Sequence, residues 1–252
     1  MSPEKRRDQV ELLGIRFDAV TRDHMVARVD DAIAASESIW LTFINVAILV
    51  QAKREPEARG LLEVADYRLC DGMGLVYASR LLKRPLPEMV SGPYMLFRLL
   101  QRAEVQHYSI FLLGSKPAVV ERAVENIRCT YPSVKVAGCR SGYYPPEDES
   151  QVVTQIRASG AQLLFVGMGF PRERLFLSKY HGQLGVPVCM DVGGAFTVLA
   201  GIHRLAPKWM RVAGLEWLYR MAQEPRRLWK RYLATNAWFC WLLAQEVVKR
   251  AK

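Results

Sequence analysis

Five short apolar runs constrain the fold of this chain more than any other feature. They are rich in β-branched and aromatic residues, and each is followed by a turn of small residues and then by a helical pattern: IWLTFIN (39–45), YSIFLLG (108–114), VKVAGC (134–139), QLLFVGM (162–168) and PVCMDVG (187–193). This alternation is typical of a parallel sheet with crossover helices. Ligands on such sheets bind outside the carboxyl ends of the strands, so the turns after the strands are the first places to examine.

Positive charge and tryptophan are concentrated at the end of the chain. Of the formal net charge of +10, residues 202–252 carry +8, and they hold five of the six tryptophans. Apolar residues recur at helical spacing on both sides of Pro225, which predicts two helices that meet at this proline. The length of 252 residues fits one α/β domain, predicted at 1–201, with a basic helical appendage at 202–252.

The appendage is predicted to lie on a membrane surface. Its most apolar piece, YLATNAWFCWLLA, has thirteen residues, whereas a helix that spans a bilayer needs about twenty. Tryptophan and tyrosine favour the headgroup region, and Lys and Arg are attracted to anionic lipid. Two alternatives stay open: the apolar stripe packs on the protein's own core or on a second subunit, or the basic surface binds nucleic acid. The many bulky apolar side chains on the same helices argue against nucleic acid.

The turns after three of the strands are candidates for binding a diphosphate. Free backbone N–H groups at the start of a helix attract phosphate, and the residues concerned are Gly114 and Ser115 in LLGSKPAVV, Gly167, Gly169 and Arg172 in VGMGFPRER, and Gly193 and Gly194 in DVGGAF. Any one of them alone is more typical of an ordinary tight turn, but three in one chain favour a phosphate-bearing ligand. No GxGxxG or GxxxxGK[ST] motif is completed, which disfavours a nicotinamide enzyme or a P-loop ATPase.

Asp71 is the candidate for acid–base chemistry. In VADYRLCDGMGLVY (64–77), Asp66 and Asp71 flank a short apolar run and two glycines follow. An aspartate at the carboxyl end of a strand can approach a substrate and act as a general base. The local pattern fits equally well a cap for the helix that begins near Met73.

Cysteine usage and the opening segment bear on location. The five cysteines form no CxxC pair and no histidine cluster lies near them, so neither a disulfide framework nor a zinc site is predicted. The opening MSPEKRRDQVELLG is charged and lacks the apolar core of a signal peptide. We therefore expect a cytoplasmic protein that is peripheral at the inner face of the cell membrane.

Several motifs together resemble the WecG/TagA/CpsF family of bacterial glycosyltransferases. The resemblance covers about residues 10 to 235 and rests on CDGMGLV, FLLGSKPAVVE, SGYY, GMGFPRE, GGAFTVLAG…APKW and GLEWLYR…EPRR. It implies an inverting, metal-independent hexosyltransferase that uses no cofactor. Such an enzyme moves a sugar from a nucleotide-sugar donor, here expected to be UDP-linked, to a polyprenyl-diphosphate-linked acceptor in exopolysaccharide or other cell-surface glycan synthesis. The resemblance also implies a tendency to form homo-oligomers.

The resemblance assigns roles to residues. Inversion needs a base for the acceptor hydroxyl, and the family's base matches Asp71, which favours catalysis over capping. Without a metal, helix N-termini and arginines must stabilise the leaving diphosphate, and Arg220, Arg226 and Arg227 match the family's tail arginines. The other residues predicted to bind substrate are Thr42, Asn45, Gly114, Ser115, Gly167, Gly169, Arg172, Glu173, Gly193 and Gly194.

The chain also departs from the family pattern in its expected pocket. Asn45 of the usual Thr-x-Asn is kept, with Thr42 one residue before the threonine place. The departures are Phe43 for threonine, Met89 for arginine, Tyr94 for aspartate, Glu173 for glutamine, Thr197 for aspartate and Leu205 for arginine. These departures leave two outcomes open: a transferred sugar other than N-acetylmannosamine, or a loss of activity. The retention of Asp71 and the tail arginines favours the first.

The predicted fold class is α/β, with a Rossmann-like, mostly parallel sheet flanked by helices and a C-terminal helical, membrane-associating appendage. Two other functions remain open from the sequence: a non-catalytic basic protein that binds membranes or nucleic acid, and a nucleotide-sugar hydrolase on the same scaffold.

Overall fold

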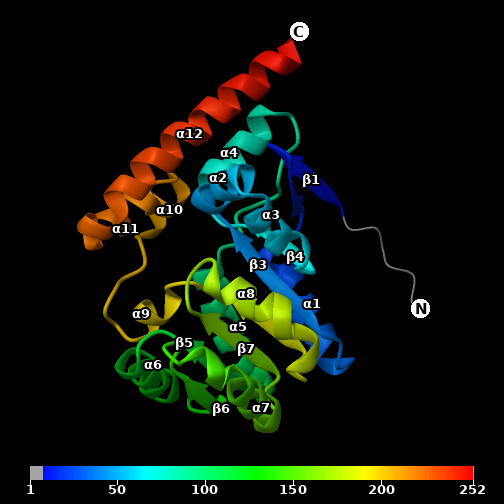
Figure 1. Cartoon of the computed structure of the whole chain (residues 1–252), viewed down its shortest axis with the longest axis vertical. Coiled ribbons are helices and arrows are strands. Elements are labelled where there is room, and N and C mark those ends of the chain that lie inside the picture. Colours follow the sequence, from blue (N-terminus) through cyan, green and yellow to red (C-terminus); the bar gives the residue numbers. More distant parts are fainter. Residues whose placement is uncertain (1–7, 252) are drawn as a thin grey trace.

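A parallel sheet of six strands forms the centre of the molecule (Figure 1). The computed structural model describes residues 8–251, so the first seven residues of the charged opening segment lie outside it. The strand order is β4-β3-β8-β7-β5-β6, with β3 (Ile39–Ile44), β4 (Tyr67–Cys70), β5 (Ser109–Gly114), β6 (Lys135–Arg140), β7 (Leu163–Gly167) and β8 (Val188–Asp191). The five predicted strands are confirmed to within two residues at each end.

Helices bury both faces of this sheet. Along β7, Leu163 and Phe165 join a core cluster with α1, α5, α6 and α9, whereas Leu164 and Val166 join a cluster with α7 and α8 on the other face. The helices are α1 (Arg22–Ala34), α2 (Val46–Arg54), α3 (Pro56–Glu63), α4 (Met73–Leu81), α5 (Gly92–Gln106), α6 (Pro117–Thr130), α7 (Glu149–Ser159), α8 (Arg172–Tyr180) and α9 (Ala195–Leu199), with single 3₁₀ turns at Pro146–Asp148 and His181–Gln183. Strands buried on both faces explain why the sequence runs are almost continuously apolar.

An antiparallel hairpin precedes the sheet and was not predicted. It consists of β1 (Gln9–Leu12) and β2 (Ile15–Asp18), and the buried side chains of Leu12 and Phe17 pack with α2 and α4 in a third cluster. Two strands of four residues give too short a pattern to stand out in the sequence.

The appendage contains α10 (Lys208–Val212), α11 (Glu216–Gln223) and α12 (Pro225–Ala251), which confirms two helices that meet at Pro225. Phe239 of α12 is buried in the third cluster, so one side of this helix packs on the protein's own body. Trp229, Leu233 and Trp241 on the same helix are 48%, 69% and 52% exposed. The predicted apolar stripe is therefore divided between the core and an outward face. No helix within 8–251 is long and apolar enough to cross a bilayer.

Candidate active site

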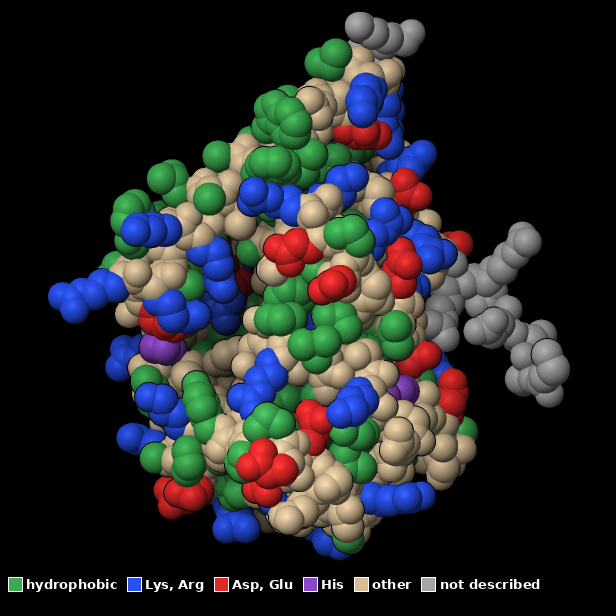
Figure 2. All heavy atoms as spheres, in the orientation of Figure 1, with side chains coloured by type: hydrophobic (Ala, Val, Ile, Leu, Met, Phe, Trp, Pro, Cys, Tyr) green, Lys and Arg blue, Asp and Glu red, His purple; other side chains and the backbone are tan. Residues whose placement is uncertain are grey.

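A cleft of about 840 Å³ opens at the carboxyl ends of the strands. Figure 2 shows this side of the molecule hollowed between the C-terminal helices and the sheet domain, with Lys and Arg side chains around the opening. Most of the residues predicted to bind substrate line the cleft: Asn45, Asp71, Ser115, Gly167, Gly169, Arg172, Glu173, Gly193, Gly194, Arg220 and Arg227. Turns after five strands thus meet two helices of the appendage in one place.

Three predicted residues do not line the cleft. Thr42 is fully buried, and its Oγ1 accepts a hydrogen bond of 2.7 Å from Arg174 Nε. Gly114 lies beneath the cleft, where a Cβ atom would stand 2.3 Å from the carbonyl oxygen of Gly167. Arg226 is exposed at the start of α12. Thr42 and Gly114 therefore support the cleft from behind, and Arg226 points elsewhere.

Asp71 follows β4 directly and lies half-buried in the cleft. The residue that caps α4 is Gly72, with a φ of 135° and no side-chain cap bond, so the alternative of Asp71 as a helix cap is wrong. Burial raises the pKa of Asp71, and this is opposed by Ser91 and by the positive charges of Arg220 and Arg174. The carboxylate can therefore accept a proton more readily than an exposed aspartate.

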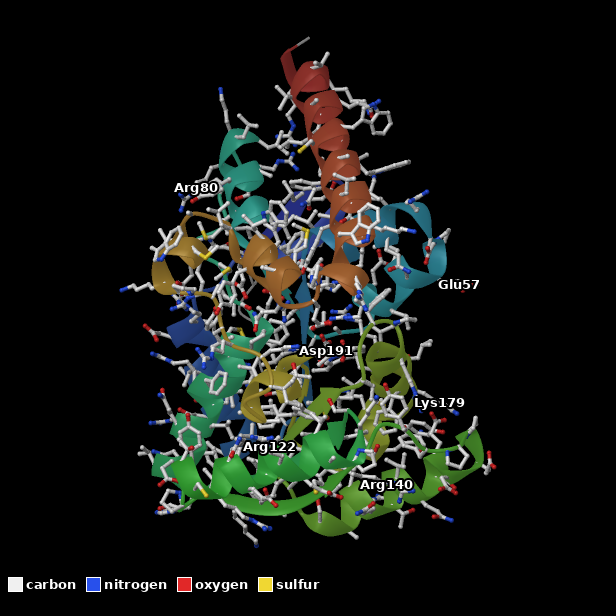
Figure 3. All side chains as sticks on the ribbon, turned by 90° about the vertical axis from the view of Figure 1, so that its left-hand side faces the viewer. Glu57, Arg80, Arg122, Arg140, Lys179 and Asp191 are labelled. Atoms are coloured by element: carbon white, nitrogen blue, oxygen red, sulfur yellow. The ribbon has the colours of Figure 1, made fainter. Side chains whose placement is uncertain are left out.

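A buried ion pair lies behind Asp71. Arg174 Nη2 is 3.0 Å from Asp191 Oδ1 and 2.6 Å from the carbonyl oxygen of Phe43, and both charged side chains are at most 2% exposed. Asp191 Oδ2 also accepts a hydrogen bond of 3.1 Å from Trp40 Nε1. Figure 3 places Asp191 near the middle of the molecule, between the C-terminal helices and α6. The pair fixes the ends of β3 and β8 against the start of α8.

Glu173 joins two of the glycine turns. Its Oε2 atom accepts hydrogen bonds from Gly169 N at 3.0 Å and from Gly193 N at 3.1 Å. Burial and the nearby charge of Asp191 raise the pKa of Glu173 to about 8. Near pH 7 the carboxyl is mostly neutral, so it resembles the glutamine that the family has at this position. This departure from the family pattern thus keeps the local hydrogen-bond chemistry.

The appendage contributes its own charged groups. Glu216 and Arg220, one helical turn apart on α11, both line the cleft. Burial and the charge of Asp71 raise the pKa of Glu216 to about 7. Burial disfavours the charged form of Arg220, but Tyr232, Asp71 and Glu216 together raise its pKa, so the guanidinium stays charged. A permanent positive charge is therefore held beside the candidate base.

Asp191, Glu216 and Arg231 also line the cleft and were not predicted. Arg174, which belongs to the predicted diphosphate turn VGMGFPRER, lines it as well. Asp191 had a usable signal, since it ends β8 directly before the double-glycine turn. The motif indicated Arg174 as a cation near the turn but not its burial, because an arginine in the first turn of a helix is normally exposed. Its burial depends on Asp191, which lies seventeen residues later in the chain.

The family departures divide into two groups. Phe43, Glu173, Thr197 and Leu205 line the cleft. Met89 and Tyr94 do not, and the ring of Tyr94 instead packs 4.3 Å from the guanidinium carbon of Arg211. Four of the six changes therefore alter the surface available to a ligand. Within the described residues, no group of three or more His, Cys, Asp or Glu side chains could hold a metal ion.

Comparison with known proteins identifies the family. The sequence model of the glycosyl transferase WecG/TagA/CpsF family matches residues 10–252. An N-acetylglucosaminyldiphosphoundecaprenol N-acetyl-beta-D-mannosaminyltransferase of Staphylococcus aureus is 33% identical over 235 residues, covering 92% of this chain and 90% of the relative. The Bacillus spizizenii protein of the same name is 29% identical over 211 residues, covering 84% and 81%. The chain therefore belongs to the glycosyl transferase WecG/TagA/CpsF family.

Proposed function

We propose that this glycosyltransferase moves a sugar from a UDP-linked donor to a polyprenyl-diphosphate-linked sugar, with inversion, during synthesis of a bacterial cell-surface glycan. The single observation that carries the proposal is the meeting of Asp71, from the sheet, with Arg220, from the appendage, in one cleft. The names of the relatives describe the same class of lipid-diphosphate acceptor. The appendage is proposed to lie at the inner face of the cell membrane, where such an acceptor is anchored.

In the proposed mechanism Asp71 removes the proton of the acceptor hydroxyl as that oxygen attacks the anomeric carbon. The bond from this carbon to the donor diphosphate breaks on the opposite face, and the nucleoside diphosphate leaves with the electron pair. Arg220 and Arg227 are positioned to offset the growing negative charge, and the turns at Ser115 and Gly169 shape the donor side of the cleft. No step requires a redox cofactor, because only a proton and a glycosyl group are transferred.

The transferred sugar is proposed to differ from the N-acetylmannosaminyl group named for the relatives. Phe43, Thr197 and Leu205 place apolar or neutral surface in the cleft where the family has polar or charged side chains. A binding pocket discriminates between sugars because a wrong sugar leaves buried polar groups without hydrogen-bond partners. These changes are therefore expected to alter which hydroxyl or amide groups of a sugar the pocket can bind. A thermal-shift panel of nucleotide-sugars would identify the donor, since a ligand that binds the native state raises its melting temperature.

The variant Asp71→Asn tests the base. It should lose nearly all sugar transfer to a synthetic lipid-diphosphate acceptor while it binds the donor nucleotide about as well as the wild type. In the wild-type enzyme the rate should fall as the pH drops through the raised pKa of Asp71, because the protonated carboxyl cannot accept a proton.

Two results would contradict this assignment. Full turnover by Asp71→Asn would remove Asp71 from the mechanism. Release of free sugar at an undiminished rate without any acceptor would instead establish a nucleotide-sugar hydrolase. Glu125→Gln is a suitable control, because Glu125 is exposed on α6 and does not line the cleft.

A further inference from the structure

A second groove, of about 410 Å³, lies at the far end of α12 from the cleft. Its walls come from four separate segments: the turn of the β1–β2 hairpin, the last turn of α2, the connection after α4 and the last turns of α12. The charged side chains that line it are Lys53, Arg84, Lys249, Arg250, Glu11 and Glu246. None of these residues belongs to the active-site cleft.

The groove has an excess of positive charge. Arg250 Nε lies 3.1 Å from Glu246 Oε1, so this pair is neutral overall. Arg84 donates only to a backbone oxygen, that of Glu11, at 3.4 Å. Within residues 8–251, Lys53 and Lys249 have no hydrogen-bond or ion-pair partner. Three cations therefore face the groove against the one remaining carboxylate.

An exposed apolar face borders the groove along α12. Four residues of α12 lie on one side of the helix, because three of them follow the first by four, seven and eight residues. They are Trp241, Gln245, Val248 and Lys249. Trp241 and Val248 are 52% and 56% exposed, while Gln245 and Lys249 line the groove. Figure 2 shows hydrophobic side chains along one flank of the upper part of α12 and Lys and Arg side chains along the other.

We propose that this groove binds the phosphate headgroup of an anionic phospholipid. Lys53, Arg84 and Lys249 pair with the phosphate, while Trp241 and Val248 contact the boundary between headgroups and acyl chains. The basic groove and the apolar face lie side by side, and a phospholipid can contact both. A free anion would contact only the basic groove, so the arrangement fits a lipid better. The proposal rests on the membrane location proposed above and extends it. Attachment at this end would fix the direction of α12 along the membrane, and therefore the orientation of the cleft.

The test compares three proteins by co-sedimentation with phosphatidylcholine vesicles that contain or lack phosphatidylglycerol. The groove variant combines Lys53→Gln, Arg84→Gln and Lys249→Gln. The matched control combines Arg122→Gln, Arg128→Gln and Lys135→Gln, which are exposed on α6 and β6 and whose side chains make no hydrogen bond or ion pair within residues 8–251. Figure 3 shows Arg122 in the opposite half of the molecule. Each protein is also assayed for transfer to a water-soluble acceptor analogue and for its melting temperature.

The groove variant should bind the anionic vesicles on the order of 100-fold more weakly than the wild type, since each surface charge is worth about fivefold. The control should bind within about threefold of the wild type. Both variants should keep the wild-type melting temperature and the wild-type transfer to the soluble analogue. The single variant Lys249→Gln changes an exposed position in the last turns of α12. It should bind the anionic vesicles about fivefold more weakly than the wild type, even if the triple variant folds poorly.

Equal vesicle binding by the groove variant and the wild type would overturn the headgroup site while leaving membrane association intact. Displacement of vesicles by low millimolar inorganic phosphate would also overturn it, because the groove would then bind free phosphate. If the wild-type protein binds neither kind of vesicle but transfers sugar to the soluble analogue, the proposed membrane location is contradicted, whereas the proposed chemistry is not.

Discussion

At the scale of residues, the cleft depends on buried polar groups whose charge is set by their surroundings. Glu173 connects the turns after β7 and β8 through Gly169 N and Gly193 N. Arg174, its neighbour, is held by Asp191, and its Nη1 atom has no hydrogen-bond partner within the described residues. This nitrogen is buried, so it is not exposed to a ligand in the cleft. The resemblance to the family predicted that Glu173 belongs to the pocket. The contact between Arg174 and Asp191 is seen only in the three-dimensional structure.

The variant Glu173→Gln should be more stable than the wild type at pH 8. The folded-state pKa of Glu173 is about 8, against about 4.3 in an unfolded chain, so folding retains a proton between these values. The stability that this proton provides is complete below about pH 4 and is lost as the pH rises toward 8. Glutamine makes the same hydrogen bonds without a charge. Its melting temperature should exceed that of the wild type at pH 8 by several degrees, at about 2–4 °C per kcal/mol.

Thermal unfolding at pH 5 and pH 8 measures this effect. Near pH 5 the two melting temperatures should lie much closer together than at pH 8, because most of the stability that the proton provides is still present. Glu125→Gln, on the surface of α6, should change neither melting temperature. A Glu173→Gln protein that is equally destabilised at both pH values would show that the carboxyl is ionised in the fold.

At the scale of elements, the sheet was predictable and the role of α12 was not. The central strands were predictable from continuous apolar runs because both of their faces are buried. The strands β1 and β2 were not predicted because they are short. The apolar pattern of α12 predicted a helix but could not show which side faces the body. Phe239 is 7% exposed and Leu233 is 69% exposed, although both are apolar. Which residues of an amphipathic helix are covered depends on the elements it meets, here α2 and the hairpin.

The variant Phe239→Ala should destabilise the whole protein by about 3–5 kcal/mol, the usual range for a buried phenylalanine. The phenylalanine packs in one cluster with side chains of α2, α4 and the hairpin, so its loss leaves a cavity between the appendage and the body. Denaturant unfolding followed by circular dichroism would measure the change. Leu233→Ala, on the exposed side of the same helix, should change the stability by about 0.5 kcal/mol or less. Equal effects of the two variants would mean that α12 does not share the core.

At the scale of the whole molecule, the cleft is complete only when the sheet domain and the appendage lie together. Asp71 follows β4 and Glu173 and Arg174 lie in the first turn of α8, while Glu216, Arg220 and Arg227 come from α11 and α12. Within the appendage, the side chain of Gln223 pairs with the backbone N–H and carbonyl of Arg204 at 2.8 and 3.0 Å, which connects α11 to the segment before α10. Most of the net charge of +10 lies in this appendage, so the part of the chain that we propose to lie on the membrane also provides cations to the cleft.

The variant Arg220→Ala tests whether the two parts form one active site. Its guanidinium is the cation that α11 places beside Asp71, and its loss should reduce kcat on the order of 100-fold, as expected when one preorganised group opposite a leaving charge is removed. The matched control is Arg226→Ala, since Arg226 lies in the same tail motif but is exposed outside the cleft. Steady-state transfer to a lipid-free acceptor analogue measures both variants without any contribution from membrane binding. If Arg226→Ala lost as much activity as Arg220→Ala, general positive charge would matter more than position. If neither variant lost activity, the appendage would serve only to attach the enzyme, and the sheet domain alone would perform the transfer.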